Sequence, residues 1–214
     1  MNKVYAVYGA SGCGRSLMPI ARQCIATGKR IYFIDDALSS ERQVNGNKAV
    51  NYDMFKTIES DEKYVLVAIA NSKVRQNLAE KITKDGIKLW TVQSHSTVIM
   101  DEVMIGAGAA LSPFVTIGAN AKIGKCFHAN LYSYVEHDCV IGDFVTFAPR
   151  VSCNGNVHIH DHAYIGTGAV IRQGTPDKPL IIGKGAVVGM GAVVTKDVPA
   201  GVTVVGNPAK VLVK

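Results

Sequence analysis

An apolar or small residue recurs at every sixth position through the second half of the chain. A step of six fits neither the 3.6-residue turn of a helix nor the two-residue alternation of a strand, but it is the repeat of a parallel β-helix built from hexapeptides. The series comprises Ile99, Ile105, Leu111, Ile117, Ile123, Ala129, Val135, Ile141, Phe147, Cys153, Ile159, Ile165 and Ile171, then Ile182, Val188, Val194 and Ala200. It predicts a β-helix over residues 94–214, with the recurring residues facing its interior.

Each hexapeptide predicts one short strand followed by one tight corner. Gly or another small or polar residue usually follows the recurring one, because corners require unusual backbone angles. A single coil cannot bury its own apolar face, so stability comes from stacking successive coils. The segment 172–180 interrupts the phase and contains Gly174, Pro176 and Pro179. We expect this segment to leave the prism as a loop.

Residues 1–93 follow a different pattern, in which expected strands alternate with expected helices. Strands are expected at 3–8, 30–34, 64–69 and 87–92, and helices at 15–27 and 72–85, closed by Gly28 and Gly86. This alternation predicts a small Rossmann-like α/β domain with a parallel sheet. Its ligand site should lie at the carboxyl ends of the strands.

The composition narrows the kinds of partner. The chain has 214 residues, a formal net charge of +6 and no apolar run long enough to span a bilayer. Its basic residues are scattered, which argues against nucleic acid and fits small polyanions such as nucleotides and coenzyme A. The five cysteines form no Cys-x-x-Cys pair, so reduced thiols are expected. The start of the chain reads as a strand rather than a signal peptide, so we expect a cytoplasmic protein without membrane insertion.

The turn from Gly9 to Gly14 follows a strand and opens a helix, where backbone N–H groups can bind phosphate. Its spacing, G-x-x-G-x-G, differs from the dinucleotide fingerprint G-x-G-x-x-G. Asp35, at the end of the second strand, stands where a ribose-binding acid would lie. We expect a half-sized nucleotide site; a plain turn beside a surface pair of acids is the alternative.

His137 and Asp138 are adjacent, just past the inward position of Val135. A carboxylate beside an imidazole can orient it and raise its basicity, which suits a general base. The alternative is a solvated surface histidine. His158, His160 and His162 could in principle bind zinc, but Ile159 points inward between the first two, and we expect no metal site. His95 and His128 are expected to be structural.

These features together resemble the bacterial sugar acetyltransferases that join a nucleotide-sugar domain to a left-handed β-helix. The resemblance is greatest to the UDP-4-amino-sugar N-acetyltransferases of the bacillosamine pathway, and the sialic acid O-acetyltransferases share the layout. Its most specific segment is Val135–Phe144. The other matching segments are Tyr8–Gly12 with Gly14, Asp35–Asp36, Ala68–Asn71 with Arg75, Asn130–Pro149 and Gly201–Lys210.

The resemblance implies acetyl-CoA-dependent N-acetylation of the 4-amino group of a UDP-linked, or dTDP-linked, sugar in the synthesis of surface glycans or glycoproteins. His137 would be the general base, oriented by Asp138, and the Gly155 N–H would stabilise the thioester oxygen. Substrate contacts are expected at Gly9, Ser11, Gly12, Arg15, Asp35, Asp36, Asn71 and Asn130, and acetyl-CoA contacts at Thr146, Gly155, Gly166 and Gly191. Acetyl-CoA would bind between the chains of a homotrimer.

Three features depart from the family pattern: Cys13 and Arg15 in the Gly-rich turn, Thr146, where a second histidine is usual, and the 172–180 loop, which is longer than usual and would reshape the coenzyme site. Three other functions stay open: O-acetylation of a sugar hydroxyl, a zinc-dependent γ-type carbonic anhydrase, and a nucleotide-sugar-binding scaffold without activity. The trimer contact is expected to use outward aromatic residues. The candidates are Phe114, Phe127, Tyr132, Tyr134 and Phe144.

Overall fold

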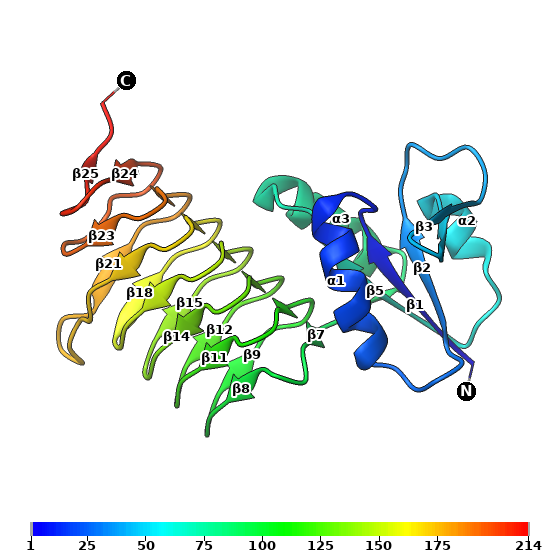
Figure 1. Ribbon diagram of the computed structural model, residues 1–214, viewed down its shortest axis with the longest axis horizontal. Coiled ribbons are helices and arrows are strands. Elements are labelled where there is room, and N and C mark those ends of the chain that lie inside the picture. The colour runs from blue at the N-terminus through cyan, green and yellow to red at the C-terminus, as the bar shows by residue number, and fades with distance from the viewer. Residues whose placement is uncertain (1, 214) are drawn as a thin grey trace.

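The computed structural model describes residues 2–213, which form two units in series (Figure 1). An α/β domain formed by the N-terminal part of the chain lies beside the first coils of a parallel β-helix. The C-terminus lies at the far end of the β-helix. Within residues 2–213, no helix combines the length and apolar character needed to cross a membrane.

The α/β domain contains a six-stranded sheet in the order β3-β4-β2-β1-β5-β6. Neighbouring strands are parallel except β3 and β4, which are antiparallel. The strands are β1 (Lys3–Tyr8), β2 (Arg30–Ile34), β3 (Arg42–Val44), β4 (Asn47–Val50), β5 (Glu62–Val67) and β6 (Lys88–Leu89). The connections after β1 and β5 lead toward opposite edges of the sheet, and ligands bind at such a switch point.

Helices cover both faces of this sheet: α1 (Gly12–Gln23) on one face, and α2 (Tyr52–Thr57) and α3 (Ser72–Lys84) on the other. The expectation that the first helix continues to Thr27 with Gly28 as its cap is wrong. The chain turns at Cys24, whose thiol hydrogen-bonds to the Gln93 carbonyl, and Gly28 (φ +82°) lies in the turn before β2. The strands β3 and β4 and the helix α2 were not expected, although Asn45 and Gly46, both with positive φ, form a typical hairpin turn.

Three parallel sheets form the faces of the β-helix. Face 1 comprises β7 (Val92–Gln93), β10 (Ala110–Leu111), β13 (His128–Ala129), β16 (Thr146–Phe147), β19 (Tyr164–Ile165), β22 (Val187–Val188) and β24 (Thr203–Val205), with β25 (Lys210–Val211) antiparallel to β24. Face 2 comprises β8 (Val98–Ile99), β11 (Thr116–Ile117), β14 (Tyr134–Val135), β17 (Ser152–Cys153), β20 (Val170–Ile171) and β23 (Val193–Val194). Face 3 comprises β9 (Met104–Ile105), β12 (Lys122–Ile123), β15 (Val140–Ile141), β18 (Val157–Ile159) and β21 (Leu180–Ile182).

The chain visits the faces in the order 1, 2, 3, so its corners form a 1–2 edge, a 2–3 edge and a 3–1 edge. Val135 pairs with Ile117 in the coil before and with Cys153 in the coil after. This register stacks the recurring residues from Leu111 to Val194 in a single apolar core, as the period of six predicted, whereas Ile99 in the first coil is exposed. The segment 172–180 leaves face 2 and returns to face 3 as the expected loop.

Three further expectations about individual side chains in the β-helix are wrong. Ala200 is exposed, and Val198 takes the inward place opposite Ile182, because the corner after Val194 is shorter than the others. Phe127 does not point outward; it fills the interior, edge-on to Phe147. The small Ala129 at the recurring position leaves the space that this ring occupies. Phe144 is also buried, in a cluster with Ala79 of α3.

Arg75 of α3 joins the two units. Its side chain is completely buried, yet within residues 2–213 its hydrogen-bond acceptors include no carboxylate. All five of its N–H groups donate hydrogen bonds, at 2.7 to 3.1 Å. The acceptors are the carbonyl oxygens of Ile69, Ala70, Cys126 and Phe144 and the hydroxyl of Thr146. The first two follow β5 and the other three belong to the β-helix, so this one side chain fixes the α/β domain against the β-helix.

Candidate active site

His137 and Asp138 lie at the 2–3 edge. The His137 Nδ1 is 2.8 Å from the Asp138 Oδ2, and about half of each side chain is exposed. Asp138 has a left-handed backbone (φ +57°), and its other oxygen accepts a hydrogen bond from the Asn120 side chain one coil earlier. The carboxylate is therefore held from two sides, and the Nε2 of His137 is left to face an incoming substrate.

His137 and Asp138 each stabilise the charged form of the other. The hydrogen bond that the His137 imidazole donates to Asp138 raises the pKa of His137 above the ordinary value, and the same bond lowers the pKa of Asp138. A stronger base results, with a carboxylate that stays ionised beside it. This arrangement can accept a proton from a nucleophile at the surface of the prism.

Gly155 lies directly against the His137 ring. A Cβ placed on Gly155 would lie 2.6 Å from both Cε1 and Nε2 of the imidazole. Ala119 and His137 occupy the same corner position in the two preceding coils, so the backbone here accepts a side chain. The ring, rather than the turn, therefore requires glycine at position 155. Within residues 2–213 the Gly155 N–H donates no hydrogen bond, so it is available to an oxyanion.

A second group of expected residues surrounds a cavity of about 270 Å³ between the α/β domain and face 1, here called the interdomain cavity. Gly12 and Cys13 at the start of α1 line it, together with His128, Asn130 and Thr146 of the β-helix.

The glycines of the turn that opens α1 differ in whether the fold requires them. Gly9 (φ +114°) and Gly14 are required by packing, since a Cβ on Gly14 would lie 1.7 Å from the Gly9 oxygen. A Cβ on Gly12 would meet nothing within 4 Å, so the fold does not require this glycine.

Other residues expected to bind substrate have structural hydrogen bonds. Asp36 accepts from the Tyr8 hydroxyl and the Tyr52 N–H, and Asp35 accepts from the Ala37 N–H. The Asn71 side-chain oxygen caps α3, which leaves its amide nitrogen for a ligand. Ser11 precedes α1 without capping it through its side chain, and Arg15 is exposed on the first turns of the helix.

The residues expected to bind acetyl-CoA do not lie together in one chain. Gly155 is at the 2–3 edge beside His137, whereas Gly166 and Gly191 are at the 1–2 edge, as is Asn130. Thr146 is buried on face 1 with its hydroxyl bonded to Arg75. Face 2 therefore separates His137 from the interdomain cavity within a single chain.

Comparison with known proteins identifies the family. Residues 5–82 match the model of the PglD N-terminal domain. A GDP-perosamine N-acetyltransferase from Escherichia coli O157:H7 is 51% identical over 211 residues, which cover 97% of this chain and 95% of that protein. The chain belongs to the hexapeptide-repeat nucleotide-sugar N-acetyltransferases. WeeI from Acinetobacter baumannii AYE superimposes with a TM-score of 0.94 at 60% identity, covering 98% of this chain and 100% of WeeI.

A perosamine N-acetyltransferase mutant from Caulobacter crescentus, solved with CoA and GDP-perosamine, superimposes with a TM-score of 0.88 at 27% identity, covering 98% of this chain and 97% of that one. These similarities confirm the expected Rossmann-like domain followed by a left-handed β-helix. They also show acetyl-CoA to be the cosubstrate of this N-acetyltransferase and a nucleotide-linked amino sugar to be its acceptor. The carbonic anhydrase, scaffold and O-acetyltransferase alternatives are accordingly set aside.

The remaining histidines of this N-acetyltransferase lie apart from His137. His158 is on face 3 and His160 is exposed at the 3–1 edge, while His162 stacks on the Phe144 ring with centroids 5.3 Å apart. Among residues 2–213, no three His, Cys, Asp or Glu side chains converge to hold a metal ion.

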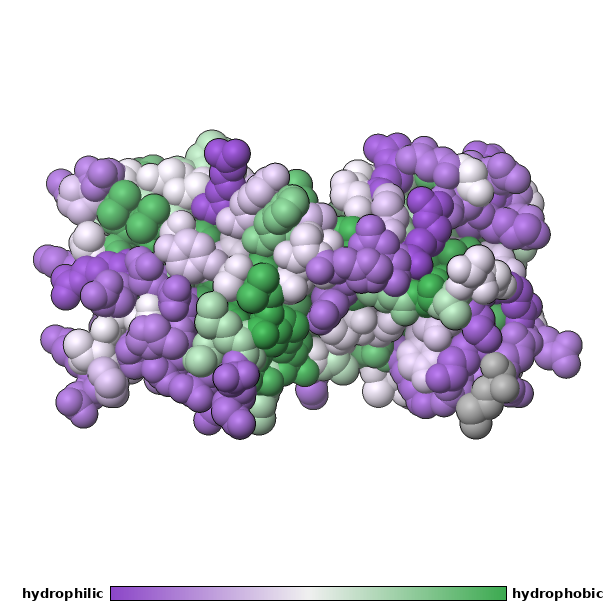
Figure 2. Space-filling model, turned by 60° about the horizontal axis from the view of Figure 1, so that its bottom comes forward, coloured by the Kyte–Doolittle hydropathy of each residue, from purple (hydrophilic) through white to green (hydrophobic). Residues whose placement is uncertain are grey.

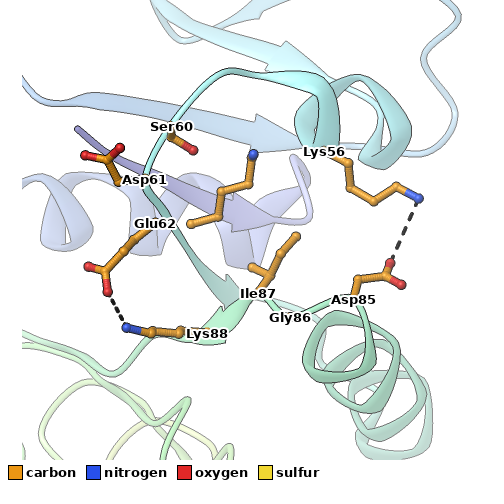
Figure 3. A pocket seen from close by; sticks show the side chains of 9 residues that line it. Lys56, Ser60, Asp61, Glu62, Asp85, Gly86, Ile87 and Lys88 are labelled. Atoms are coloured by element: carbon orange, nitrogen blue, oxygen red, sulfur yellow. Dashed lines mark hydrogen bonds and ion pairs between the residues drawn. The ribbon is translucent and has the colours of Figure 1, made fainter. Parts of the chain in front are cut away.

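A separate hollow of about 380 Å³ lies at the amino ends of β5 and β6, opposite the Gly-rich turn (Figure 3). Two ion pairs occupy four of its charged side chains: Lys88 with Glu62, and Lys56 with Asp85 at 3.9 Å; Asp61 and Lys63 also line it. Glu62 also forms an ion pair with Lys3. Hydrogen bonds from Lys88, the Tyr64 hydroxyl and Lys3 lower the pKa of Glu62 to about 2. Since these charges are already compensated, we do not place the acceptor in this hollow.

Proposed function

We propose that this N-acetyltransferase transfers the acetyl group of acetyl-CoA to the 4-amino group of a GDP-linked sugar such as GDP-perosamine. The sequence suggested UDP or dTDP as the nucleotide, but the relative that matches nearly the full chain is a GDP-perosamine enzyme. The His137–Asp138 pair beside the free Gly155 N–H is the observation that carries the chemistry. We also propose that the enzyme acts in the cytoplasm.

The reaction needs one base and one oxyanion donor. The amine attacks the thioester carbonyl while neutral His137 accepts an amine proton at Nε2, and Asp138 stabilises the imidazolium that forms. The Gly155 N–H stabilises the negative oxygen of the tetrahedral intermediate. Collapse of the intermediate expels the CoA thiolate, which takes up the proton from His137. The amide product and CoA balance the atoms and charges, and no covalent enzyme intermediate is required.

We place acetyl-CoA along the 2–3 edge, extending from His137 toward the 172–180 loop. The Gly174 N–H donates to the Gly155 oxygen at 3.0 Å, so the 172–180 loop begins directly beyond Gly155. Farther along lies a hollow of about 420 Å³ whose lining includes Arg172, Lys178 and Lys196. These cations favour the phosphates of CoA, with the thioester lying back toward His137.

A homotrimer would bring the interdomain cavity of one chain next to His137 and Gly155 of another. With face 2 of each copy turned toward a shared axis, the 1–2 edge of one copy meets the 2–3 edge of its neighbour. Asn130 and the interdomain cavity of one copy then face His137 and Gly155 of the next. Gly166 and Gly191 would approach the coenzyme of the neighbouring copy in the same way.

The 1–2 edge has the surface such a contact needs. Phe114 and Tyr132 stack with ring centroids 4.8 Å apart, each more than half exposed, and the Arg150 guanidinium lies 5.8 Å from the Tyr132 ring.

Figure 2 shows hydrophobic surface at the end of the β-helix nearer the α/β domain. Exposed apolar side chains in its first coils include Val98, Met100 and Met104. A patch of this kind favours association with another chain.

The decisive assay measures CoA release from acetyl-CoA with GDP-, UDP- and dTDP-linked 4-amino sugars, and identifies each product by mass and NMR spectroscopy. We expect the highest kcat/KM with a GDP-linked 4-amino sugar, acetylation at nitrogen, and loss of turnover in His137→Ala. A preference for UDP-linked sugars would overturn the nucleotide assignment. Undiminished turnover in His137→Ala would overturn the mechanism.

A further inference from the structure

His128 lines the interdomain cavity but has no assigned role. It lies on β13 with only 4% of its surface exposed, two residues before Asn130. Its Nε2 has no hydrogen-bond partner within residues 2–213. A buried polar atom without a partner destabilises the folded protein, so its retention beside a cavity requires an explanation.

The surroundings of His128 keep its ring neutral. Burial, and next the positive charge of Arg75, lower its pKa well below the ordinary value, and the Val67 backbone only partly opposes this shift. A neutral imidazole carries one N–H donor and one acceptor nitrogen. Its backbone hydrogen bond to Val67 uses the N–H, so the unpartnered Nε2 is left to accept a hydrogen bond from a donor such as a hydroxyl.

The rest of the cavity lining fits an uncharged, hydroxyl-bearing ligand. Ser16, Ser112 and Asn130 contribute neutral polar groups, and no acidic side chain and no lysine or arginine belongs to the lining. Thr146 pairs in register with His128 on the adjacent strand, and its hydroxyl already accepts a hydrogen bond from Arg75. The opening of α1 at Gly12 borders the same cavity and offers backbone N–H groups to a phosphate. A diphosphate at α1 would thus place the attached sugar beside His128.

We propose that His128 is a specificity residue that hydrogen-bonds a hydroxyl of the sugar ring in the nucleotide-sugar acceptor. The inference rests on the proposed function. It assigns His128 a role different from that of His137, because His128 is buried, lies across face 2 from the 2–3 edge, and neither gives nor takes a proton in the reaction. A site that hydrogen-bonds a buried hydroxyl discriminates strongly against sugars that lack it.

The test compares His128→Phe, which keeps a planar ring without polar atoms, with His128→Gln, which keeps a donor and an acceptor. His160→Phe, at an exposed position on the 3–1 edge, is the matched control. We expect His128→Phe to raise the KM for the nucleotide sugar about tenfold or more, with an intermediate rise in His128→Gln. The KM for acetyl-CoA and the Kd for free GDP, measured by calorimetry, should stay within about twofold of wild type, as should every constant in His160→Phe.

A second measurement needs no variant. In the wild-type enzyme with labelled histidine, the nucleotide sugar should shift the His128 imidazole resonances, whereas GDP alone should not. An unchanged KM in His128→Phe, or unshifted resonances, would overturn the inference while acetyl transfer by the wild type still upheld the proposed function. An equal loss of GDP affinity would move the contact from sugar to nucleotide and also overturn it. Wild-type enzyme that transfers acetyl to no amino sugar would overturn the proposed function, and this inference with it.

Discussion

The Nη2 of Arg75 donates a hydrogen bond of 2.8 Å to the hydroxyl of Thr146, across the boundary between the α/β domain and face 1 of the β-helix. Burial lowers the pKa of Arg75 to about 10, which still leaves the guanidinium charged at neutral pH. The charge is dispersed over neutral acceptors that surround it completely. Removing either partner would leave buried polar groups without a bond.

Arg75→Met should therefore destabilise the protein by about 3 kcal/mol or more, because five acceptors lose their donor in a dry interface. Thr146→Val should cost about 1–3 kcal/mol, since it leaves one guanidinium N–H unpaired. Urea unfolding at a fixed protein concentration measures both. Arg42→Met, at an exposed position of β3, is the control and should change stability by less than about 0.5 kcal/mol. A comparably mild effect of Arg75→Met would show that the two units are not held together by this residue.

The pH dependence should report the His137–Asp138 pair. Because the base must be neutral and its pKa is raised by Asp138, kcat/KM should fall as the pH drops through a value above the ordinary histidine pKa of about 6.5. Asp138→Asn should move this acidic limb to lower pH and reduce the plateau rate about tenfold or more, since basicity and orientation are both lost. The measurement is a pH–rate profile with saturating acetyl-CoA. An acidic limb that stays in place in Asp138→Asn would assign it to another group.

Gly155→Ala should lower kcat about a hundredfold while the protein stays folded. The new methyl group would displace the His137 ring, from which a Cβ would be 2.6 Å distant, whereas the backbone at this corner position already accepts alanine at Ala119. Steady-state kinetics gives kcat, and the thermal midpoint serves as the internal control. A large fall in the thermal midpoint would instead point to a strained turn.

Gly12→Ala and Gly14→Ala form a matched pair. Gly12→Ala should leave stability unchanged or slightly raised and increase the KM for the nucleotide sugar several-fold, because its Cβ points into free space where we propose the diphosphate binds. Gly14→Ala should unfold or strongly destabilise the α/β domain. Thermal denaturation and kinetics separate the two effects. A Gly12→Ala enzyme with an unaltered KM would exclude close approach of substrate to this turn.

Mixing two inactive variants should restore activity if sites form between chains. His137→Ala supplies an intact interdomain cavity, and Asn130→Leu supplies an intact general base. Randomly mixed trimers should recover about a quarter of the wild-type activity, the fraction of interfaces that join one good half of each kind. Refolding the mixture and assaying acetyl transfer tests this, with each variant refolded alone as the control. An active monomer by light scattering would exclude the shared site.

The sequence predicted the β-helix closely because the six-residue pattern that specifies this fold is local and repeats in successive coils. Each coil needs an inward apolar residue and a permissive corner, and both are visible in the period. The errors arose where neighbouring coils compensate one another, as where Phe127 fills the space beside Ala129. They also arose where a corner changes length, as at Val198.

The site was predictable to a lesser extent. The His137–Asp138 contact follows from adjacency, and the separation of seven positions between Asn130 and His137 already implies different corners of the prism. The hydrogen bonds of Arg75 join residues far apart in the chain, so no local pattern signals them. His128 has an outward strand position that was visible in the sequence, but its burial depends on the α/β domain packed over it.

The complete enclosure of Arg75 bears on which sugar carbon becomes acetylated. In the proposed trimer, Arg75 fixes each α/β domain to its own β-helix, so the separation between the proposed nucleotide site of one chain and His137 of its neighbour cannot adapt to the acceptor. An amine attached one carbon nearer to or farther from the diphosphate would miss the thioester even if it were equally nucleophilic. Regioselectivity then depends on the distance between the diphosphate and the amine of the sugar. The enzyme can distinguish positional isomers although its contacts to the nitrogen are the same.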